Sequence, residues 1–296
     1  MKKYRPRSNA NGPNYVRPLL GPRAAGGESI MRVSTVLFGA LVATIAIVVT
    51  GCTVQATIKT KNRFVEENVT TESPTDWNGE DIVVNDQAVG ASINGGLEIV
   101  ADASATKVRA VARVLAMANA DDKASADLSI AEAKTSFTVS GGAVACGHGG
   151  SHGSSNSGES GCEKLTVYVP IGTAAKKVNI KGLVGNGGMT MKVSSVNLGN
   201  LEGNSNGGDI DATVGTGTSV SLVSEKSDNI VLRLPDTFAA DVIILNADQG
   251  NIINDFSDAK VGENAGGRGT AGSGYTSIKL TSKQFAGSSG KVTLTR

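Results

Sequence analysis

Two cysteines and both histidines of the chain lie in one glycine- and serine-rich segment, CGHGGSHGSSNSGESGC, at residues 146–162. Two thiolates and two imidazoles make a ligand set that structural zinc accepts. In an oxidising compartment the same two cysteines would instead form a disulfide. The choice between these two kinds of site therefore depends on where the protein matures. The four residues concerned are Cys146, His148, His152 and Cys162.

The spacing of these four residues favours the disulfide. Zinc sites usually contain closely spaced cysteine pairs, which this segment lacks, and a glycine-rich loop supplies few side chains that could orient the imidazoles. No base and no helix N-terminus lies close enough in the sequence to activate either thiol. We therefore predict a Cys146–Cys162 disulfide, solvated side chains for His148 and His152, no metal site and no cofactor.

Aspartates near the turns of the second half of the chain are the remaining candidates for chemistry. Acids at successive turns could line a groove that binds and cleaves a polysaccharide, or they could be solvated residues that keep strand edges from pairing. A Ser-His-Asp hydrolase is not indicated, because both histidines lie in one loop and no nucleophile elbow is present. We predict a protein without enzymatic activity, with an acid-dependent carbohydrate-active enzyme as the alternative. The acids considered are Asp209, Asp211, Asp228, Asp248 and Asp255.

An apolar segment that ends in a cysteine indicates the compartment. From Met31 the sequence reads MRVSTVLFGALVATIAIVVTGC, with one arginine, an uncharged apolar run and small residues before Cys52. This order is typical of a secretory signal peptide, and VTGC resembles the lipobox of bacterial lipoproteins, in which the cysteine is lipidated. The alternative is an uncleaved membrane anchor, since the run approaches the roughly 20 residues that a helical span needs. Residues 1–51 are thus expected to be a basic extension and a signal or anchor helix outside the folded domain.

The charge balance changes when this segment is set aside. Residues 1–51 hold seven of the 28 basic residues and one of the 27 acidic residues, so residues 52–296 carry 21 bases and 26 acids. A mildly acidic domain lacks the basic patch that nucleic-acid binding requires. We therefore expect no nucleic-acid partner, and a membrane partner only through the lipid anchor.

The remaining chain divides into a tether and one β-rich domain. Residues 52–79 are rich in threonine and glutamate with a weak pattern, which indicates a tether. From residue 80 onward, short runs of alternating apolar and polar residues recur, as in LTVYV at 165–169 and SVSLV at 219–223. Such a period of two is typical of half-buried strands. One alanine-rich stretch, Ala120–Ala133, predicts a short helix that buries Ala124, Leu128 and Ala131.

A repeat of about 20 residues gives the expected architecture. Five sites combine a turn residue, a polar residue and a strand, and they begin at Gly188, Gly208, Asp228, Gly250 and Gly290. One repeat of this length cannot bury its own apolar face, so each would stack on the next as a coil of a β-solenoid. The alternative is a β-sandwich of hairpins, which need not keep its period so closely. We predict an all-β, single-stranded β-solenoid over residues 80–296 with one short helix.

Several of these features together resemble a family of bacterial lipoproteins that carry an adhesin-like β-helix domain of unknown function. They are the VTGC at residues 49–52, the strand 165–169 that ends at Pro170, the strand 230–234 that ends at Pro235, and the Gly-Asp-Ile and Gly-Lys-Val strand starts. The resemblance covers roughly residues 80–296, and the 262–274 loop departs from its regular pitch. It implies a location in the bacterial cell envelope and offers no catalytic residues to carry over.

The resemblance also suggests a location and a role. Thr53, which follows the cysteine, is not an acid, and in such lipoproteins this implies the outer membrane or the cell surface. We therefore predict a non-enzymatic, lipid-anchored envelope protein that presents its solenoid for adhesion. Its partner would be a glycan or an envelope protein.

Overall fold

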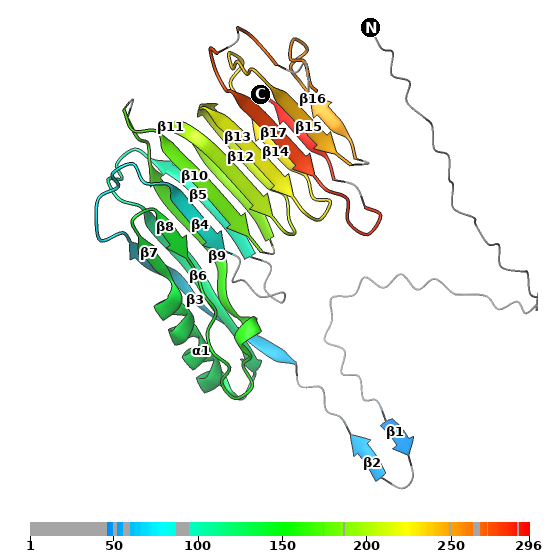
Figure 1. The fold of residues 1–296 in the computed structure, drawn as a ribbon. Helices are drawn as coiled ribbons and strands as arrows, with labels where there is room; N and C mark the ends of the chain where they lie inside the picture. Colours follow the sequence, from blue (N-terminus) through cyan, green and yellow to red (C-terminus); the bar gives the residue numbers. More distant parts are fainter. Residues whose placement is uncertain are drawn as a thin grey trace, which may run out of the picture. The chain divides into compact units, whose positions relative to one another are not determined.

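The structure is a computed structural model (Figure 1) that describes the chain in two compact units, residues 1–58 and 59–296. The described residues are 46–49, 52–55, 60–86, 95–173, 175–185, 187–248, 250–262, 267–270, 272–288 and 290–296.

The first unit contains a two-stranded antiparallel hairpin. Strands β1 (Ala46–Val49) and β2 (Cys52–Gln55) pair with Val49 opposite Cys52. Most of the predicted signal or anchor helix lies outside the described residues, but residues 46–49 near its end form β1 and not a helix. Three of these four, Ile47, Val48 and Val49, are β-branched, which favours a strand. No helix within the described part of the chain has the length and apolar character that crossing a membrane requires.

The second unit begins earlier than the sequence indicated. Residues 61–72, which we expected to belong to a tether, form the long strand β3 (Lys61–Glu72) of this unit. Most of its side chains are exposed, because β3 pairs with a neighbour on one side only. An edge strand of this kind shows little of the alternation by which buried strands are recognised, and this explains the error.

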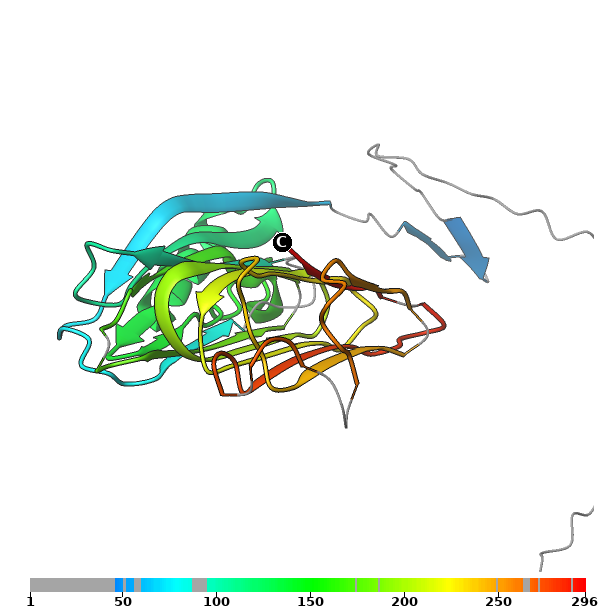
Figure 2. The same cartoon turned by 90° about the horizontal axis from the view of Figure 1, so that it is seen from above.

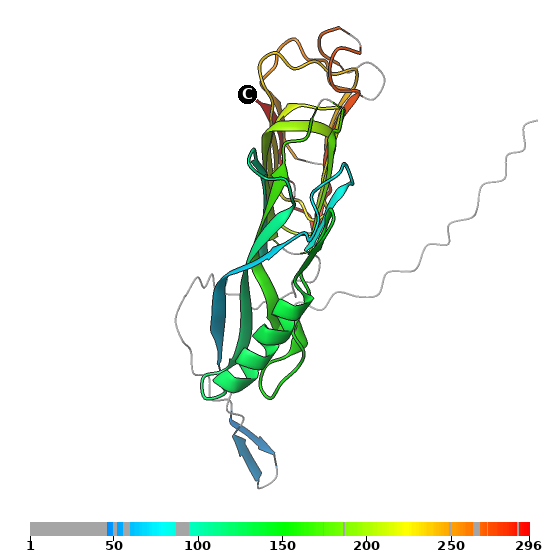
Figure 3. The same ribbon diagram turned by 90° about the vertical axis from the view of Figure 1, so that its left-hand side faces the viewer.

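Sixteen strands of the second unit form one hydrogen-bonded network. It consists of two sheets that share the long strand β11 (Gly187–Ser205), whose first part belongs to one sheet and whose second part belongs to the other. Sheet 1 contains, in spatial order, β3, β6 (Arg109–Asn119), β9 (Ser160–Pro170), β5 (Gly95–Asp102), the first part of β11, β12 (Ile210–Thr216), β14 (Ile230–Arg233), β18 (Val292–Thr295) and β16 (Ile252–Asn254). Sheet 2 contains β7 (Thr138–Ser140), β8 (Ala143–Ala145), β4 (Ile82–Asp86), β10 (Val178–Val184), the second part of β11, β13 (Ser219–Ser224), β17 (Ser277–Ser282) and β15 (Ile243–Ala247). Figures 2 and 3 show these strands as two facing layers.

From β8 to β18 the chain alternates between the two sheets, and this alternation encloses the core. From β10 to β18 every ladder is parallel, which excludes a sandwich of antiparallel hairpins in this region. Along each strand every second side chain points inward, as with Ile210 and Ala212 of β12 and Val220 and Leu222 of β13, all fully buried. In the described part of the chain, the predicted all-β character with one α-helix is confirmed.

The five repeat sites fall at strand starts of sheet 1. Each precedes or begins β11, β12, β14, β16 or β18, and the apolar residues that follow are in register across the sheet, with Ile210 opposite Ile230, Ile230 opposite Val292, and Val292 opposite Ile252. The spatial order differs from the chain order, because β18 lies between β14 and β16. The step from Gly250 to Gly290 is twice the repeat length. Between these two glycines, the described strands are β16 of sheet 1 and β17 of sheet 2.

The helix α1 (Lys123–Ser136) closes one end of the space between the sheets, as Figure 3 shows. Asp122 caps it, and its buried residues are Ser125, Ala126, Ser129, Ile130 and Ala133. The predicted stripe was wrong: Leu128 is 54% exposed. The helix instead packs its small residues against the alanine-rich inner side of β6, where close approach is favoured over bulk.

Candidate functional site

The structure contains the predicted bond between Cys146 and Cys162. The two Cα atoms lie 6.2 Å apart and both side chains are buried. The disulfide links the end of β8 to β9 and closes the glycine-rich loop between them. Since both sulfurs are consumed in this bond, neither is available as a thiolate ligand.

We had predicted solvated side chains for His148 and His152, and this was wrong. The Nδ1 atom of His148 lies 2.8 Å from the carbonyl oxygen of Ser160, and Nε2 of His152 lies 2.9 Å from Oε1 of Glu132 on α1. Each ring therefore joins the loop to a neighbouring element. Within the described ranges, no three His, Cys, Asp or Glu side chains converge in a way that could hold a metal ion.

Serines join the same loop to α1. The hydroxyl of Ser129, which is fully buried, donates to the carbonyl of Gly150 at 3.0 Å and lies 3.0 Å from the hydroxyl of Ser155, which is also fully buried. A side chain at position 149 would place its Cβ 2.0 Å from the carbonyl oxygen of Ser129, so only glycine fits there. Glycine at this position is therefore required by the close packing of the loop on the helix.

Two acids complete this contact. Asp122 accepts hydrogen bonds from the backbone N–H and the hydroxyl of Ser154 at 2.9 and 2.8 Å and from the hydroxyl of Ser125 at 2.7 Å. These bonds, the Ser154 N–H first, lower the pKa of Asp122 to about 2. The backbone N–H of Gly150 and then His152 lower the pKa of Glu132. Both carboxylates are thus held ionised in a structural role, and neither is poised as a general acid.

The five aspartates considered for catalysis do not form one groove. Three accept backbone hydrogen bonds from neighbouring turns: Asp209 from Asn229 N at 2.8 Å, Asp228 from Gly208 N at 2.7 Å, and Asp248 from Gln284 N at 3.1 Å. Asp211 pairs with Arg233 on the outer face of sheet 1, and Asp255 follows β16, where it accepts from the hydroxyl of Thr295 at 2.5 Å. Each acid stabilises a turn or pairs across strands.

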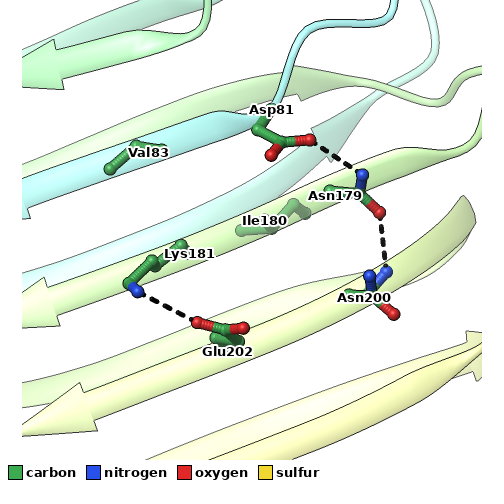
Figure 4. A pocket seen from close by; sticks show the side chains of 7 residues that line it. All are labelled: Asp81, Val83, Asn179, Ile180, Lys181, Asn200 and Glu202. Atoms are coloured by element: carbon green, nitrogen blue, oxygen red, sulfur yellow. Dashed lines mark hydrogen bonds and ion pairs between the residues drawn. The ribbon is translucent and has the colours of Figure 1, made fainter.

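A polar ladder on the outer face of sheet 2 forms the candidate site (Figure 4). Asn179 on β10 donates through Nδ2 to Asp81, beside β4, at 2.8 Å. Its Oδ1 accepts from the backbone N–H of Asn200 on β11 at 2.9 Å, and Oδ1 of Asn200 accepts from the hydroxyl of Ser219 on β13 at 2.7 Å. Four consecutive strands are therefore connected by side chains as well as by their backbones.

A shallow groove of about 200 Å³ lies beside this ladder. An ion pair between Lys181 and Glu202, 3.1 Å apart, forms its far side, and both side chains stay about half exposed. A second depression of about 140 Å³ continues past this pair to Ser221 and Val223. The groove offers amide donors and acceptors and one charge of each sign, with no paired nucleophile and base among its lining residues, so its chemistry suits binding.

The sequence contained a signal for this ladder that we did not use. Asn179 and Asn200 are 21 residues apart, close to the repeat length, and each is an outward residue at the start of a strand of sheet 2. Residues that recur at the repeat length lie side by side on neighbouring strands. The repeat predicted from glycine and aspartate positions covers the strand starts of sheet 1 and does not include the asparagines of sheet 2.

The outer face of sheet 1 has a different character. Its side chains form ion pairs across strands, Lys192 with Glu98 at 2.7 Å and Arg233 with Asp211. Arg109 lies over the ring of Tyr168, with 4.0 Å from the guanidinium carbon to the ring centroid. These pairs provide a reference surface against which the groove of sheet 2 can be tested.

Comparisons with known proteins leave the family of this chain open. No protein-family model matches the chain, and no curated protein matches it in sequence. Among solved structures, a "putative cell adhesion protein" from Clostridium sporogenes is similar with 13% sequence identity and a TM-score of 0.46, over 80% of this chain and 99% of that one. The resemblance to adhesin-like lipoproteins therefore stays a prediction.

Proposed function

We propose that this protein is a non-enzymatic binding protein of the bacterial cell envelope that holds its partner on the outer face of sheet 2. The observation that carries the proposal is the groove beside the Asp81–Asn179–Asn200–Ser219 ladder. Its side chains are fixed by hydrogen bonds on one side, while Lys181 and Glu202 remain about half exposed on the other. Groups held in place in this way lose little conformational freedom when a ligand binds.

The partner class that fits this face is a polar polymer, a glycan before a protein. The groove crosses several strands at right angles to their direction, and its donors and acceptors repeat at the strand spacing of roughly 4.8 Å. A repetitive face of this kind can engage successive units of a chain, so weak single contacts add up through multivalency. Adhesion is the process that such a surface would serve.

The parallel sheets support the further proposal that residues 80–296 form a β-solenoid. From β8 to β18 the chain passes alternately between the sheets, and the ladders keep one register from Met189 through Ile210 to Ile230. Stacked coils make a rigid body with long lateral faces, which is the geometry that an extended binding surface needs.

We also propose that Cys52 carries the lipid that attaches this body to a membrane. The signal-like segment before it and the engagement of the other two cysteines in a disulfide support this role. Expression of the full chain in a bacterial host with an alkyne fatty acid should label the protein, and Cys52→Ala should remove the label. Labelling that persists in Cys52→Ala would contradict the lipid anchor at Cys52. The proposal of a binding face on sheet 2 does not depend on this result.

A pair of matched variants tests the binding face. The full chain is applied to immobilised envelope polysaccharides and to isolated peptidoglycan, and the variant Lys181→Ala/Glu202→Ala is compared with Lys192→Ala/Glu98→Ala, which removes an equivalent ion pair from sheet 1. We expect the first variant to weaken binding at least several-fold and the second to leave it unchanged. Equal effects of the two variants would contradict a site on sheet 2.

The same polysaccharides test the enzymatic alternative. Release of reducing ends by the wild-type chain, lost in Asp209→Asn or Asp228→Asn, would favour an acid-dependent carbohydrate-active enzyme. We expect no release, because both carboxylates already accept backbone hydrogen bonds from neighbouring turns.

A further inference from the structure

The long strand β3 lies at an edge of sheet 1 and differs from the other edge strands. Within the described residues, four strands of the second unit have a neighbour on one side only: β3, β7, β15 and β16. β7 and β16 have three residues each, and β15 has five, with the Gly262 N–H bonded to the Ile243 carbonyl on its open side. β3 has 12 residues. Short edges are a common protection against pairing with another chain, and β3 lacks that protection.

A bulge limits the part of β3 that could pair with another strand. The register with β6 shifts between Glu66 and Val69, and Asn68 within the bulge has a φ of 57°. Such a bulge ends regular pairing at an edge. The regular part of β3 therefore runs from Lys61 to Glu66, and Glu67 begins the bulge.

The charges of residues 61–67 complement those of a second copy. Basic residues come first, Lys61 and Arg63, and acidic residues last, Glu66 and Glu67. Two such strands that run antiparallel can place Arg63 of each copy against Glu67 of the other. Each of these two charges also has a partner within the chain, Glu163 for Arg63 and Arg113 for Glu67, so pairing of two copies would extend existing ion pairs.

The faces of the sheet fix the register of this pairing. Arg63 and Val65 lie opposite Met117 and Leu115 of β6 on the outer face, and Glu67 contacts Arg113 on the same face. In an antiparallel pair about a twofold axis perpendicular to the sheet, opposite residues share a face. An axis through Val65 then sets Arg63 of each copy opposite Glu67 of the other.

The exposure of these residues permits the contact. Arg63 is 52% exposed, Glu67 57% and Val65 36%. On the inner side, a groove of about 490 Å³ lies between residues 63–66 of β3 and α1, and an ion pair between Lys134 and Glu66 crosses it, so the exposed contacts of this edge lie on the outer face. We infer that two copies of the chain associate through antiparallel pairing of β3 with β3, centred on Val65, which would join sheet 1 of each into one continuous sheet.

Cysteine cross-linking tests the axis directly. In a Cys52→Ser background, where Cys146 and Cys162 are already bonded, Val65→Cys should form a disulfide-linked dimer of the full chain under mild oxidation, because residues on the axis have Cα atoms roughly 4.5–5.5 Å apart. Thr70→Cys, on the same strand beyond the bulge, should not. Equal cross-linking of the two variants would overturn the pairing.

Charge reversal tests the pairing in solution. By sedimentation equilibrium we expect Arg63→Glu to weaken dimerisation roughly tenfold or more, and Arg63→Glu/Glu67→Arg to restore it. Ion pairs within one chain predict the opposite order. In the double variant, an acid at position 63 would face Glu163 and a base at position 67 would face Arg113, so both intrachain pairs would be repulsive and the double variant would be more disturbed than the single. A wild-type chain that stays monomeric, or a double variant weaker than the single, would overturn the inference.

Discussion

At the scale of single residues, an acid and a glycine show how the 146–162 loop is held on α1. Asp122 illustrates this: its carboxylate holds the N-terminus of α1 and the Ser154 turn at once. Gly149 is needed because no side chain fits against the Ser129 carbonyl. The loop whose cysteines and histidines could have formed a metal site is therefore docked on a helix by these contacts.

The depressed pKa of Asp122 leads to a prediction about pH. Its pKa of about 2 in the folded protein lies below the value of about 3.9 expected when unfolded, so its ionised form stabilises the fold above pH 4. This contribution is lost as the pH falls from about 4 to about 2. We expect Asp122→Ala to lower Tm at pH 7, and the difference from wild type to shrink in melts at pH 3 and 2. A difference that does not change with pH would contradict this role.

The disulfide leads to a second prediction at this scale. The cysteines are 16 residues apart, and closing a loop of this length stabilises a fold by about 3 kcal/mol on the chain-entropy model. We expect Cys146→Ser/Cys162→Ser to lose about this much in the free energy of unfolding, measured by urea denaturation. Cys52→Ser serves as the control, since Cys52 is outside the loop. A loss under about 1 kcal/mol would show that the hydrogen bonds to α1 hold the loop by themselves.

At the scale of elements, the two sheets fit together through pairs of large and small residues. Met189 and Met191 of β11 point inward from sheet 1, and Gly182 and Gly203 lie opposite them in sheet 2. A Cβ at Gly203 would approach Leu222 to 2.8 Å and the end of Met191 to 3.1 Å. Gly182 and Gly203 therefore leave room for the methionine side chains, and neither glycine serves to form a turn.

A comparison of two glycines tests this fit. Gly203→Val should overfill the core and cost about 1–3 kcal/mol in the free energy of unfolding. Gly96→Val, in β5, should be neutral or stabilising, because a Cβ added at this glycine would have no atom within 4 Å and valine favours strands. Urea denaturation of both variants gives the measurement. A Gly203→Val variant as stable as Gly96→Val would mean that the methionines yield without cost.

The elements also show what the sequence could and could not predict. Alternation and turn residues located the strand starts at Gly208 and Asp228, because these patterns are local. The edge strand β3 and the ladder through Asn179 depend on which strands lie side by side, and a pattern within one strand does not contain that information. The stripe of α1 was wrong because Asp122 caps the helix and small residues, not Leu128, pack on β6.

At the scale of the whole second unit, the order of the last strands couples the two halves of the fold. The chain forms β15 and β16 first in sequence, and then returns to insert β17 and β18 between them and the earlier strands. The outermost strands therefore contact the rest of each sheet through the end of the chain. No local pattern predicts this order. A parallel ladder with the same register could form whether β16 or β18 were the strand next to β14.

This order makes the C-terminal strand a central element and gives the last prediction. Leu294 in β18 is fully buried between β14 and β16, while Thr293 points outward. We expect Leu294→Ala to cost about 2–5 kcal/mol and Thr293→Ala less than about 1 kcal/mol in urea denaturation. If β18 were instead a frayed terminal strand, both substitutions would be mild. Because β18 lies between β14 and β16, deletion of residues 292–296 should expose the facing edges of both strands. We expect β16 to separate from sheet 1, and this separation should appear as lost hydrogen-exchange protection at Ile252 and Ile253.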